Sequence, residues 1–513
     1  MTRREFVGAT VGAAAWQFAS SRSWAAAAAA PSTDPTALTL SEAAAAIRAG
    51  TVTSVQLTEA CLARIATYDS KLGAFITVMR EQALAQARAR DAETKAGAAR
   101  GPLHGIPIAL KDNIDTRGVR TTAGSAVFAS RIPTEDAAVV ARLLAAGAVI
   151  IGKTNLYEFA MGGISFFGPA RNPWALDLIP GGSSSGAAAA VASGLCFGAL
   201  GTDTGGSVRQ PAAYCNLVGL KPTNGLVSLR GIIPGVLSLD TCGPLTRTVE
   251  DTALVLNAVA GYDRLDITSS DRPREDYVAA LRQPVNGLRL GLPTGYFDRL
   301  DPEIQRATNE ALAVLARLTQ STREMTFPPT APAGMDGGGS GVSAELYAYH
   351  EEFGRHDLPK YMLPQRRRIE ALAATHGGDA ADYVRGQWAL QLLRRTIDDS
   401  FKEVDLAVMP TERDLPPTLN SYIKGTYDTT PRDPGTSFAN CPPINVYGIP
   451  AISIPCGFSR DGLPIGLMIA GPNFSEGRLL ALAHAYEQAT EWHKRRPALT
   501  PDMPVPPVDF PRE

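Results

Sequence analysis

Two turns rich in glycine and serine constrain this 513-residue chain more than any other feature. The first spans residues 181–186 and the second residues 201–209, which places Ser183 and Ser207 24 residues apart. The alanine-rich segment between the turns predicts a helix. Glycine allows backbone conformations that other residues avoid and leaves N–H groups accessible to a ligand. A serine in such a turn is therefore a candidate nucleophile, with candidate donors to an oxyanion beside it.

A lysine, rather than a histidine, is the candidate base for such a serine. Of the six histidines, only His104 lies in the glycine-rich N-terminal half, in a sequence typical of a loop. Lys111 ends an apolar run typical of a strand, so we expect its ammonium group to be buried or to lie at a strand end. Burial disfavours the charged form and lowers the pKa of a lysine, as a base near neutral pH requires. The alternative is a lysine that is ion-paired beside Asp112.

Three stretches, in this order, resemble the motifs of the amidase signature family. They are Lys111-Asp-Asn, the Gly-Gly-Ser-Ser-Ser-Gly turn at 181–186 and Gly-Thr-Asp-Thr-Gly-Gly-Ser-Val-Arg at 201–209. The resemblance extends from about residue 37 to residue 497, with further matches at 168–174, 219–223, 240–244 and 462–467. It implies a single large α/β domain, with a mixed central β-sheet sandwiched between α-helical layers, and it implies no cofactor.

The resemblance also implies a catalytic triad. Ser207 would be the nucleophile, and Ser183, preceded by a cis peptide bond, would be the bridging serine. Neutral Lys111 would be the final base, accepting a proton from Ser183 as Ser183 takes one from Ser207. The backbone N–H groups that would face the developing oxyanion are those of Thr204, Gly205, Gly206 and Ser207.

Other residues are expected to support the site or to form its walls. We expect Asp203 and Arg209 to hold the catalytic loop and Ser184 to form hydrogen bonds within its turn. The resemblance places the walls of the substrate pocket in residues 161–167, in Tyr214 and in parts of 329–445. The first of these segments includes Met161, Gly162, Gly163, Phe166 and Phe167, the two aromatic rings either lining an apolar pocket or packing in the core. No metal site is expected, because the histidines lack the spacing of metal ligands.

Two motifs in the chain have other interpretations. Residues 147–154 match the phosphate-binding loop pattern, but a helical pattern precedes them and their central residues favour a strand. Gly147 therefore predicts the end of a helix, and residues 148–151 a buried strand. Residues 182–186 match the nucleophile elbow of α/β-hydrolases. The preceding segment ends in Pro180 and is a poor central strand, and an elbow would leave Lys111 without a role.

Along the chain, helices and strands alternate in a way typical of an α/β architecture. Capping boxes at Thr39 and Thr53 predict the first two helices, and alternation continues from about residue 104 to residue 260. Residues 329–400 are interpreted as a helical and loop insertion over the core, and residues 496–513 as a proline-rich tail on the surface. All of residues 31–513 are assigned to one domain.

The first 30 residues differ from the rest. Arg3 and Arg4 precede a weakly apolar, alanine-rich segment that ends in small residues, a pattern typical of a bacterial twin-arginine export signal. We therefore expect a periplasmic or secreted enzyme. The six cysteines form no C-x-x-C pair and are expected to be buried free thiols.

Composition excludes several function classes. The net charge is −2 and no basic run indicates a nucleic-acid partner. No apolar stretch of 18 residues predicts a membrane span. The expected partner is a small-molecule amide, and the enzyme is expected to be a homodimer or a monomer.

The main hypothesis is a hydrolase of carboxamide C–N bonds that releases ammonia or an amine. Aryl acylamides, carbamates and esters remain open, because acyl-serine chemistry does not exclude them. The alternative is an amidotransferase A-type subunit that requires a partner, although residues 161–167 lack the Ser-Thr-Glu-Asn run common in such subunits. A third hypothesis is a fold retained for binding alone.

Overall fold

The computed structural model describes residues 34–331, 340–428 and 440–510. The predicted export signal at residues 1–30 lies outside the described residues. The chain divides into two units, Met1–Asp34 and Pro35–Glu513, and the fold below is that of the second unit. No helix in the described part of the chain combines the length and the apolar character that a bilayer crossing requires.

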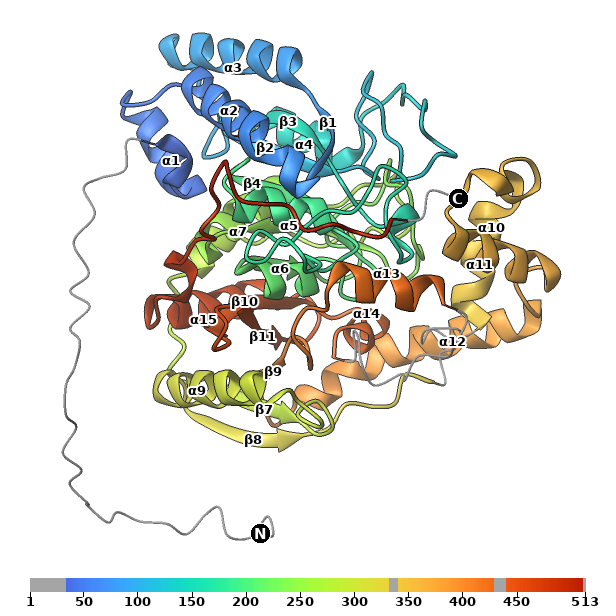
Figure 1. Cartoon of the computed structure of the whole chain (residues 1–513). Helices are drawn as coiled ribbons and strands as arrows, with labels where there is room; N and C mark the ends of the chain where they lie inside the picture. Colours follow the sequence, from blue (N-terminus) through green and yellow to red (C-terminus); the bar gives the residue numbers. More distant parts are fainter. Residues whose placement is uncertain (1–33, 332–339, 429–439, 511–513) are drawn as a thin grey trace. The chain divides into compact units, whose positions relative to one another are not determined.

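A mixed β-sheet of eleven strands forms the centre of this unit (Figure 1). Its spatial order is β1-β3-β2-β4-β6-β5-β10-β11-β9-β7-β8. The pairs β3–β2, β2–β4, β9–β7 and β7–β8 are parallel, and the other neighbours are antiparallel. The strands are β1 (Phe75–Val78), β2 (Pro107–Lys111), β3 (Val149–Thr154), β4 (Gly198–Asp203), β5 (Val218–Lys221), β6 (Thr241–Thr246), β7 (Arg289–Pro293), β8 (Ser321–Met325), β9 (Leu406–Pro410), β10 (Ala451–Phe458) and β11 (Pro464–Ala470).

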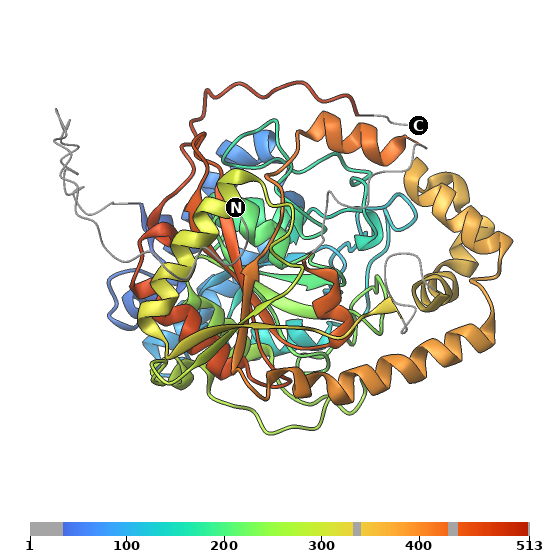
Figure 2. The same cartoon turned by 90° about the horizontal axis from the view of Figure 1, so that it is seen from below.

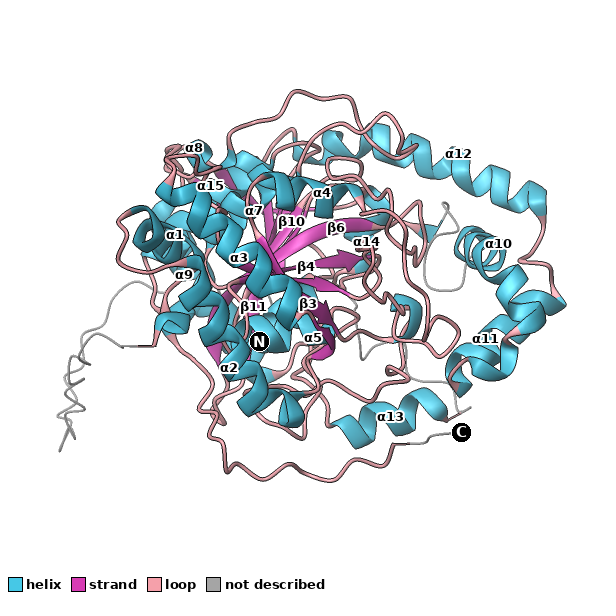
Figure 3. Cartoon of the chain, turned by 90° about the horizontal axis from the view of Figure 1, so that it is seen from above, coloured by secondary structure: helices cyan, strands magenta, loops and turns pink. Residues whose placement is uncertain are grey.

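Helices flank this sheet and confirm the predicted α/β class (Figure 3). Two of them, α5 and α6, pack against each other and against central strands, while α7, α9 and α15 form another packed group. The helices are α1 (Leu40–Arg48), α2 (Ser54–Leu72), α3 (Arg80–Lys95), α4 (Ala138–Ala145), α5 (Ser185–Ala192), α6 (Arg209–Cys215), α7 (Val249–Val259), α8 (Tyr277–Ala280), α9 (Pro302–Leu318), α10 (Ser340–His356), α11 (Leu363–Ala374), α12 (Ala380–Thr396), α13 (Leu419–Tyr427), α14 (Pro442–Tyr447) and α15 (Glu476–Gln488).

The helix starts follow the local sequence signals. Thr39 and Thr53 each accept a hydrogen bond from the backbone of the third residue of their helix, and the side chains of Glu42 and Gln56 accept hydrogen bonds in return. Both predicted capping boxes are therefore confirmed. All six cysteines are buried and free, as predicted.

Three consecutive helices, between β8 and β9 in sequence, lie beside the sheet (Figure 2). These are α10, α11 and α12, drawn in gold and orange. An apolar cluster separate from the main core joins them to the segment 233–239 through Leu346, Ile369 and Leu390. That residues 329–400 are an insertion over the core stays a prediction.

The phosphate-loop pattern at 147–154 forms the turn after α4 and the strand β3, as predicted. Its lysine, Lys153, is fully buried and lies 3.2 Å from the carboxylate of Asp112. It also donates a hydrogen bond of 2.7 Å to the hydroxyl of Thr121. Lys153 is therefore the partner of Asp112, a role that the sequence had left open for Lys111.

Candidate active site

The two Gly/Ser turns meet the end of β2 near the carboxyl ends of the neighbouring parallel strands β2 and β4. Lys111 is the last residue of β2, Ser183 precedes α5, and Ser207 lies between β4 and α6. The peptide bond between Gly182 and Ser183 is cis, as the family resemblance implies. The ammonium nitrogen of Lys111 lies 2.7 Å from the hydroxyl oxygen of Ser183. The fold therefore brings the end of β2 to the turn that carries Ser183.

Lys111 is completely buried, and its partners are uncharged oxygens. Besides Ser183, it donates to the hydroxyl of Thr202 at 2.8 Å and to the Thr202 carbonyl at 3.3 Å. Burial lowers the pKa of Lys111 to about 7, against the opposing effect of the negative charges of Asp240 and Asp203. A substantial neutral fraction at neutral pH is what a general base requires.

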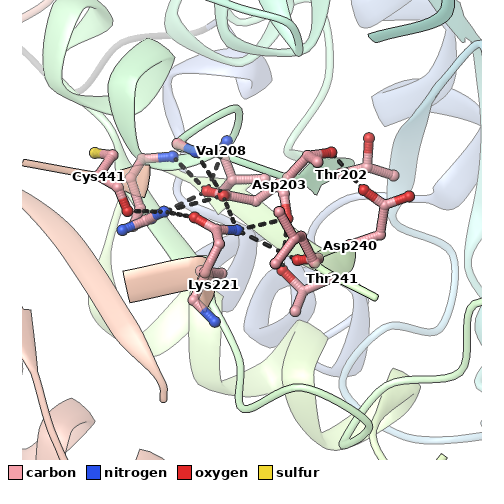
Figure 4. A network of polar contacts seen from close by, with 12 residues as sticks. Thr202, Asp203, Val208, Lys221, Asp240, Thr241 and Cys441 are labelled. Atoms are coloured by element: carbon pink, nitrogen blue, oxygen red, sulfur yellow. Dashed lines mark hydrogen bonds and ion pairs between the residues drawn. The ribbon is translucent and has the colours of Figure 1, made fainter. Parts of the chain in front are cut away.

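The loop that carries Ser207 is organised by Asp203 (Figure 4). The carboxylate of Asp203 accepts hydrogen bonds from the backbone N–H groups of Gly206 and Val208 and forms a buried ion pair with Arg209. Although burial raises the pKa of Asp203, Arg209 and neighbouring donors hold it well below its usual range. The structure places Asp203 and Arg209 where a supporting role requires them.

One expected oxyanion donor is already engaged. The Gly206 N–H donates to the carboxylate of Asp203 at 2.7 Å, so it does not point toward a substrate carbonyl. This corrects the expected set of donors. The N–H groups of Thr204, Gly205 and Ser207 have no acceptor within residues 34–331, 340–428 and 440–510, and they remain the candidates. Similarity to the motif could not show which of these N–H groups is free, because that depends on the direction of the Asp203 side chain.

The turn around Ser183 is held by hydrogen bonds to β4 and to the turn that carries Ser207. The N–H of Ser184 donates to the Ser207 carbonyl at 3.2 Å, and its hydroxyl donates to the Thr202 carbonyl at 3.2 Å. Because Ser184 is completely buried, it does not form the exposed nucleophile of an elbow. The structure corrects the expectation that Ser184 forms hydrogen bonds within its own turn, because its partners are Thr202 on β4 and Ser207 in the second turn.

A cavity of about 370 Å³ opens above these groups, and both Ser183 and Ser207 line it. Thr204 and Gly205 line it as well. Its remaining walls are Tyr157, Ala160, Met161, Gly162, Gly235, Val236, Leu239, Val342, Leu346, Arg368 and Pro442. These residues come from the segments 157–162 and 235–239 and from α10, α11 and α14, so the cavity is mainly apolar with one arginine.

Several expected wall residues lie elsewhere. Phe166 and Phe167 are 43% and 36% exposed and line a different cavity beside Lys71. Tyr214 is buried against Ile179 and donates its hydroxyl hydrogen to the backbone carbonyl of Asp414. These aromatic side chains therefore do not line the cavity at Ser207, which corrects the expectation.

Gly163 lies beside the wall without lining it. A Cβ at this position would meet the side chains of Gln365 and Thr426 at 3.6 Å. Its neighbours Met161 and Gly162 are held by α11, because Arg368 donates to the Met161 carbonyl and Gln365 to the Gly162 carbonyl.

Sequence reasoning missed three polar residues of the site. The carboxylate of Asp240, immediately before β6, accepts a hydrogen bond from the hydroxyl of Thr204. Asn445, on α14, donates to the Asp203 carboxylate at 2.8 Å, and Thr202 receives Lys111. Thr202 and Asp240 lie inside the segments 201–209 and 240–244, which resemble motifs of the family. No local sequence signal marks Asn445.

No cluster of three or more histidine, cysteine, aspartate or glutamate side chains in the described ranges could hold a metal ion. The chemistry that this site can supply is nucleophilic attack by a serine, proton transfer through a second serine to a buried lysine, and oxyanion stabilisation by backbone amides.

Comparison with known proteins agrees with this chemistry. The family model described as "Amidase" matches residues 56–480. The A subunit of the glutamyl-tRNA(Gln) amidotransferase of Roseiflexus sp. (strain RS-1) is 43% identical over 491 residues, covering 91% of this chain and 99% of the relative.

Solved structures are similar over most of the chain. The native peptide amidase from Stenotrophomonas maltophilia has a TM-score of 0.75 and 33% identity, covering 90% of this chain and 98% of that chain. The A subunit of the glutamyl-tRNA(Gln) amidotransferase from Thermotoga maritima has a TM-score of 0.71 and 31% identity, covering 90% and 96%.

Proposed function

This chain belongs to the amidase family and cleaves carboxamide C–N bonds, and we propose that Ser207, Ser183 and Lys111 carry out that cleavage. The observation that carries the proposal is the 2.7 Å contact between the buried Lys111 ammonium and the Ser183 hydroxyl at the floor of the cavity that Ser207 lines. Without this contact between Lys111 and Ser183, neither serine would have a base.

The reaction begins when the Ser207 hydroxyl oxygen attacks the substrate carbonyl carbon. The Ser207 proton passes to Ser183, and the Ser183 proton passes to neutral Lys111. The negative oxygen that forms is stabilised by backbone N–H groups of the 204–207 loop, one such donor being worth about 3–4 kcal/mol of the barrier. The proton then returns through Ser183 to the nitrogen as the C–N bond breaks. Water cleaves the acyl–Ser207 ester and releases a carboxylic acid.

The walls of the cavity support an amide with an apolar acyl group. Val236, Leu239, Val342 and Leu346 present apolar side chains there, and Arg368 is the one charged side chain among the described lining residues. Ammonia or a small amine leaves as the C–N bond breaks, and turnover is complete when water releases the acyl group. Aryl acylamides, carbamates and esters with a similar acyl group fit the same walls.

A second candidate function is that of an amidotransferase A-type subunit. It is favoured by the 43% identity to the Roseiflexus protein over nearly the full length of that protein. In that case the enzyme would need a second chain to use the ammonia it releases.

Export by the twin-arginine route is part of the proposal. It is supported by Arg3, Arg4 and the small residues that follow. In a bacterial host, the full chain is expected in the periplasmic fraction, and a chain with both arginines changed to lysine is expected to stay in the cytoplasm. Equal distribution of the two chains would contradict export.

The test of the catalytic proposal uses the purified full chain without a partner. It is assayed for product release from short aliphatic amides, aryl acylamides, peptide C-terminal amides, carbamates and glutamine. Ser207→Ala and Lys111→Met should each lower kcat by at least about 10³-fold, and the exposed Lys402→Met should not change it. Turnover that survives Ser207→Ala would overturn the triad. Glutamine turnover only with a second chain present would favour the amidotransferase.

A further inference from the structure

A second, larger cavity of about 1000 Å³ lies next to the cavity at Ser207. The segments 234–238, 267–272 and 473–474 and one side of α12 form its walls. Gly235 lines both cavities. On α10, Leu346 lines the cavity at Ser207, and its neighbour Glu345 lines the second one. The two cavities therefore share a wall.

Three arginines line this second cavity without a matching carboxylate. Arg394 donates to the carbonyls of Val446 and Ser238 at 3.1 and 2.7 Å, and these acceptors are neutral. Arg272 and Arg395 are exposed. In the described part of the chain, none of the three lies within ion-pair distance of a carboxylate.

The two carboxylates of the cavity are occupied by neutral donors. Glu345 accepts hydrogen bonds from the Ser238 N–H and from the side chain of Gln387. Asp398 accepts from the backbone and side-chain N–H groups of Asn473. A partly buried guanidinium surrounded by neutral dipoles is a favourable site for an added anion, because a charge-assisted hydrogen bond replaces weaker ones.

Other features of the cavity suit an organic rather than an inorganic anion. The hydroxyl oxygen of Ser238 is buried and has no hydrogen-bond partner among the described residues. Leu237 and Ile267 are 37% and 93% exposed where they line the cavity. A ligand with an anionic group and an apolar body would use both the arginines and these side chains.

Arg394 also connects the second cavity to the catalytic loop. It donates to the side-chain oxygen of Asn224, whose amide group donates to the backbone carbonyl of Asp240. Asp240 in turn accepts from the hydroxyl of Thr204. By another route, Arg394 donates to the carbonyl of Asn445, and the Asn445 side chain donates to Asp203.

We propose that this second cavity binds a small organic carboxylate through Arg272, Arg394 and Arg395, and that its occupation alters catalysis through the shared wall. The carboxylate contacts the guanidinium groups, and its apolar body lies against Leu237 and Ile267. Movement of Arg394 toward the ligand would change its hold on the Ser238 carbonyl, and Ser238 lies in the chain between Val236 and Leu239 of the wall of the cavity at Ser207.

The binding test needs no turnover, so its failure is distinguishable from failure of the proposed function. Phenylacetate is titrated by calorimetry into the full chain carrying Ser207→Ala, with the neutral 2-phenylethanol as comparison. We expect saturable binding of phenylacetate alone. Arg395→Gln and Arg272→Gln should each weaken it on the order of tenfold. Both side chains are exposed and lack an ion-pair partner among the described residues, and Arg272 lies over the ring of Phe474.

Matched variants locate the binding. Arg385→Gln, on another face of α12 and outside the cavity, should leave the affinity unchanged. Arg368→Gln, in the cavity at Ser207, should also leave it unchanged. The proposal would be overturned if Arg368→Gln abolished binding while Arg395→Gln left the affinity unchanged. It would also be overturned if the folded protein did not bind phenylacetate.

Coupling is measured in the active enzyme. Phenylacetate should change kcat or KM for the best amide substrate, and Arg395→Gln should shift this effect to about tenfold higher phenylacetate concentrations. Purely competitive inhibition that persists unchanged in Arg395→Gln would contradict coupling through the second cavity.

Discussion

Asp240 acts on the catalytic loop in two physically separate ways. Its hydrogen bonds join Thr204 to the N–H groups of Gly235 and Val236, and so fix the loop against the cavity wall. Its negative charge raises the pKa of Lys111, against the larger effect of burial. Asp203 is paired with Arg209, whereas Asp240 has no ion-pair partner among the described residues. The charge of Asp240 therefore stabilises the protonated lysine that forms when Ser207 attacks.

Replacing Asp240 by asparagine separates these two effects. Asp240→Asn keeps an acceptor for Thr204 but removes the charge, so the pKa of Lys111 should fall and the acid limb of the kcat/KM profile should move to lower pH. We also expect kcat to decrease by about tenfold to a hundredfold. The measurement is kcat/KM from pH 5 to pH 9.

Thr204→Val is the matched control for Asp240→Asn. It removes the hydroxyl group and keeps the carboxyl group, whose pKa burial raises to about 6 and which the hydrogen bond from Thr204 lowers. The pKa of Asp240 should therefore rise further in Thr204→Val, so we expect kcat to fall and the acid limb to move less than in Asp240→Asn. Identical pH profiles for Asp240→Asn and the native enzyme would show that Asp240 acts by position alone.

The residues predicted from sequence and those that were missed differ in how they are held. Lys111, Ser183 and Ser207 lie in glycine-rich or strand-end motifs whose local geometry is determined by neighbouring residues. Asn445 reaches Asp203 from a helix 242 positions away, and only tertiary packing reveals the contact. The Gly206 N–H differs, because its acceptor Asp203 lies only three residues away, and the motif does not reveal the direction of that side chain.

At the scale of single elements, helix α5 shows why the first turn ends in glycine. A Cβ at Gly186 would lie 2.3 Å from the Ala74 carbonyl oxygen and 2.4 Å from the Asn155 nitrogen. Gly186 is a position of close approach between the helix and two backbone segments. Alanine is the better helix former by about 1 kcal/mol, yet we expect packing to outweigh this preference.

Gly186→Ala should therefore destabilise the protein by about 1–3 kcal/mol, the usual cost of overpacking a core. Urea unfolding followed by circular dichroism measures the change. Gly287→Ala is the control, since no atom lies within 4 Å of a Cβ there. A Gly186→Ala protein as stable as the native one would mean that α5 can move away from the backbone of Ala74 and Asn155 without cost.

Helix α14 contributes through one buried side chain. Asn445 donates to both the backbone and the side chain of Asp203 and accepts a hydrogen bond of 2.6 Å from Arg209. Leucine is similar in size to asparagine, but Asn445→Leu removes the hydrogen bonds that Asn445 makes to the buried ion pair of Asp203 and Arg209. The expected loss is about 2–4 kcal/mol of the free energy of unfolding.

The control for Asn445→Leu is Asn309→Leu on the exposed side of α9. Both variants are compared by urea unfolding, and kcat is measured for each under native conditions. Asn445→Leu should also lower kcat, because Asp203 holds the Ser207 loop. A loss of stability no larger than that of Asn309→Leu would contradict this account.

For the whole sheet, sequence predicted the class but not the order of strands. Alternating strand and helix patterns indicated an α/β layered domain, and the sheet confirms it. The placement of β5 between β6 and β10, and of β9 between β11 and β7, depends on pairing between segments far apart in the chain. Hydrophobic periodicity describes which face of a strand is buried and carries no information on its neighbour.

Buried charges make the stability of the whole protein depend on pH. Burial raises the pKa of Glu158 to about 8, which the hydrogen bonds from Ser125 and Met362 oppose. The protonated form is thus favoured in the folded protein, and the stability from Glu158 is present below its unfolded pKa and lost as pH rises through about 8. Glu158→Gln imitates the protonated form. Its stability relative to the native protein should therefore increase between pH 5 and pH 8, as urea unfolding at both pH values would measure.

Lys111 changes the stability with pH in the opposite direction to Glu158. Its pKa is lowered by burial from 10.5 to about 7, so the unfolded chain binds more protons than the folded one between these two pH values. Stability from this group is therefore present above the unfolded pKa and lost as pH falls to the folded pKa of about 7. Lys111→Met removes the burden of a buried ammonium group, and the variant should be more stable than the native enzyme at pH 6, although inactive.

This advantage of Lys111→Met should shrink by up to about 1.4 kcal/mol per pH unit above pH 7. Urea unfolding at pH 6, 8 and 9.5 measures it, with the exposed Lys402→Met as control. An advantage independent of pH would mean that Lys111 stays charged in the resting enzyme, and the base would then need to lose its proton only after substrate binds.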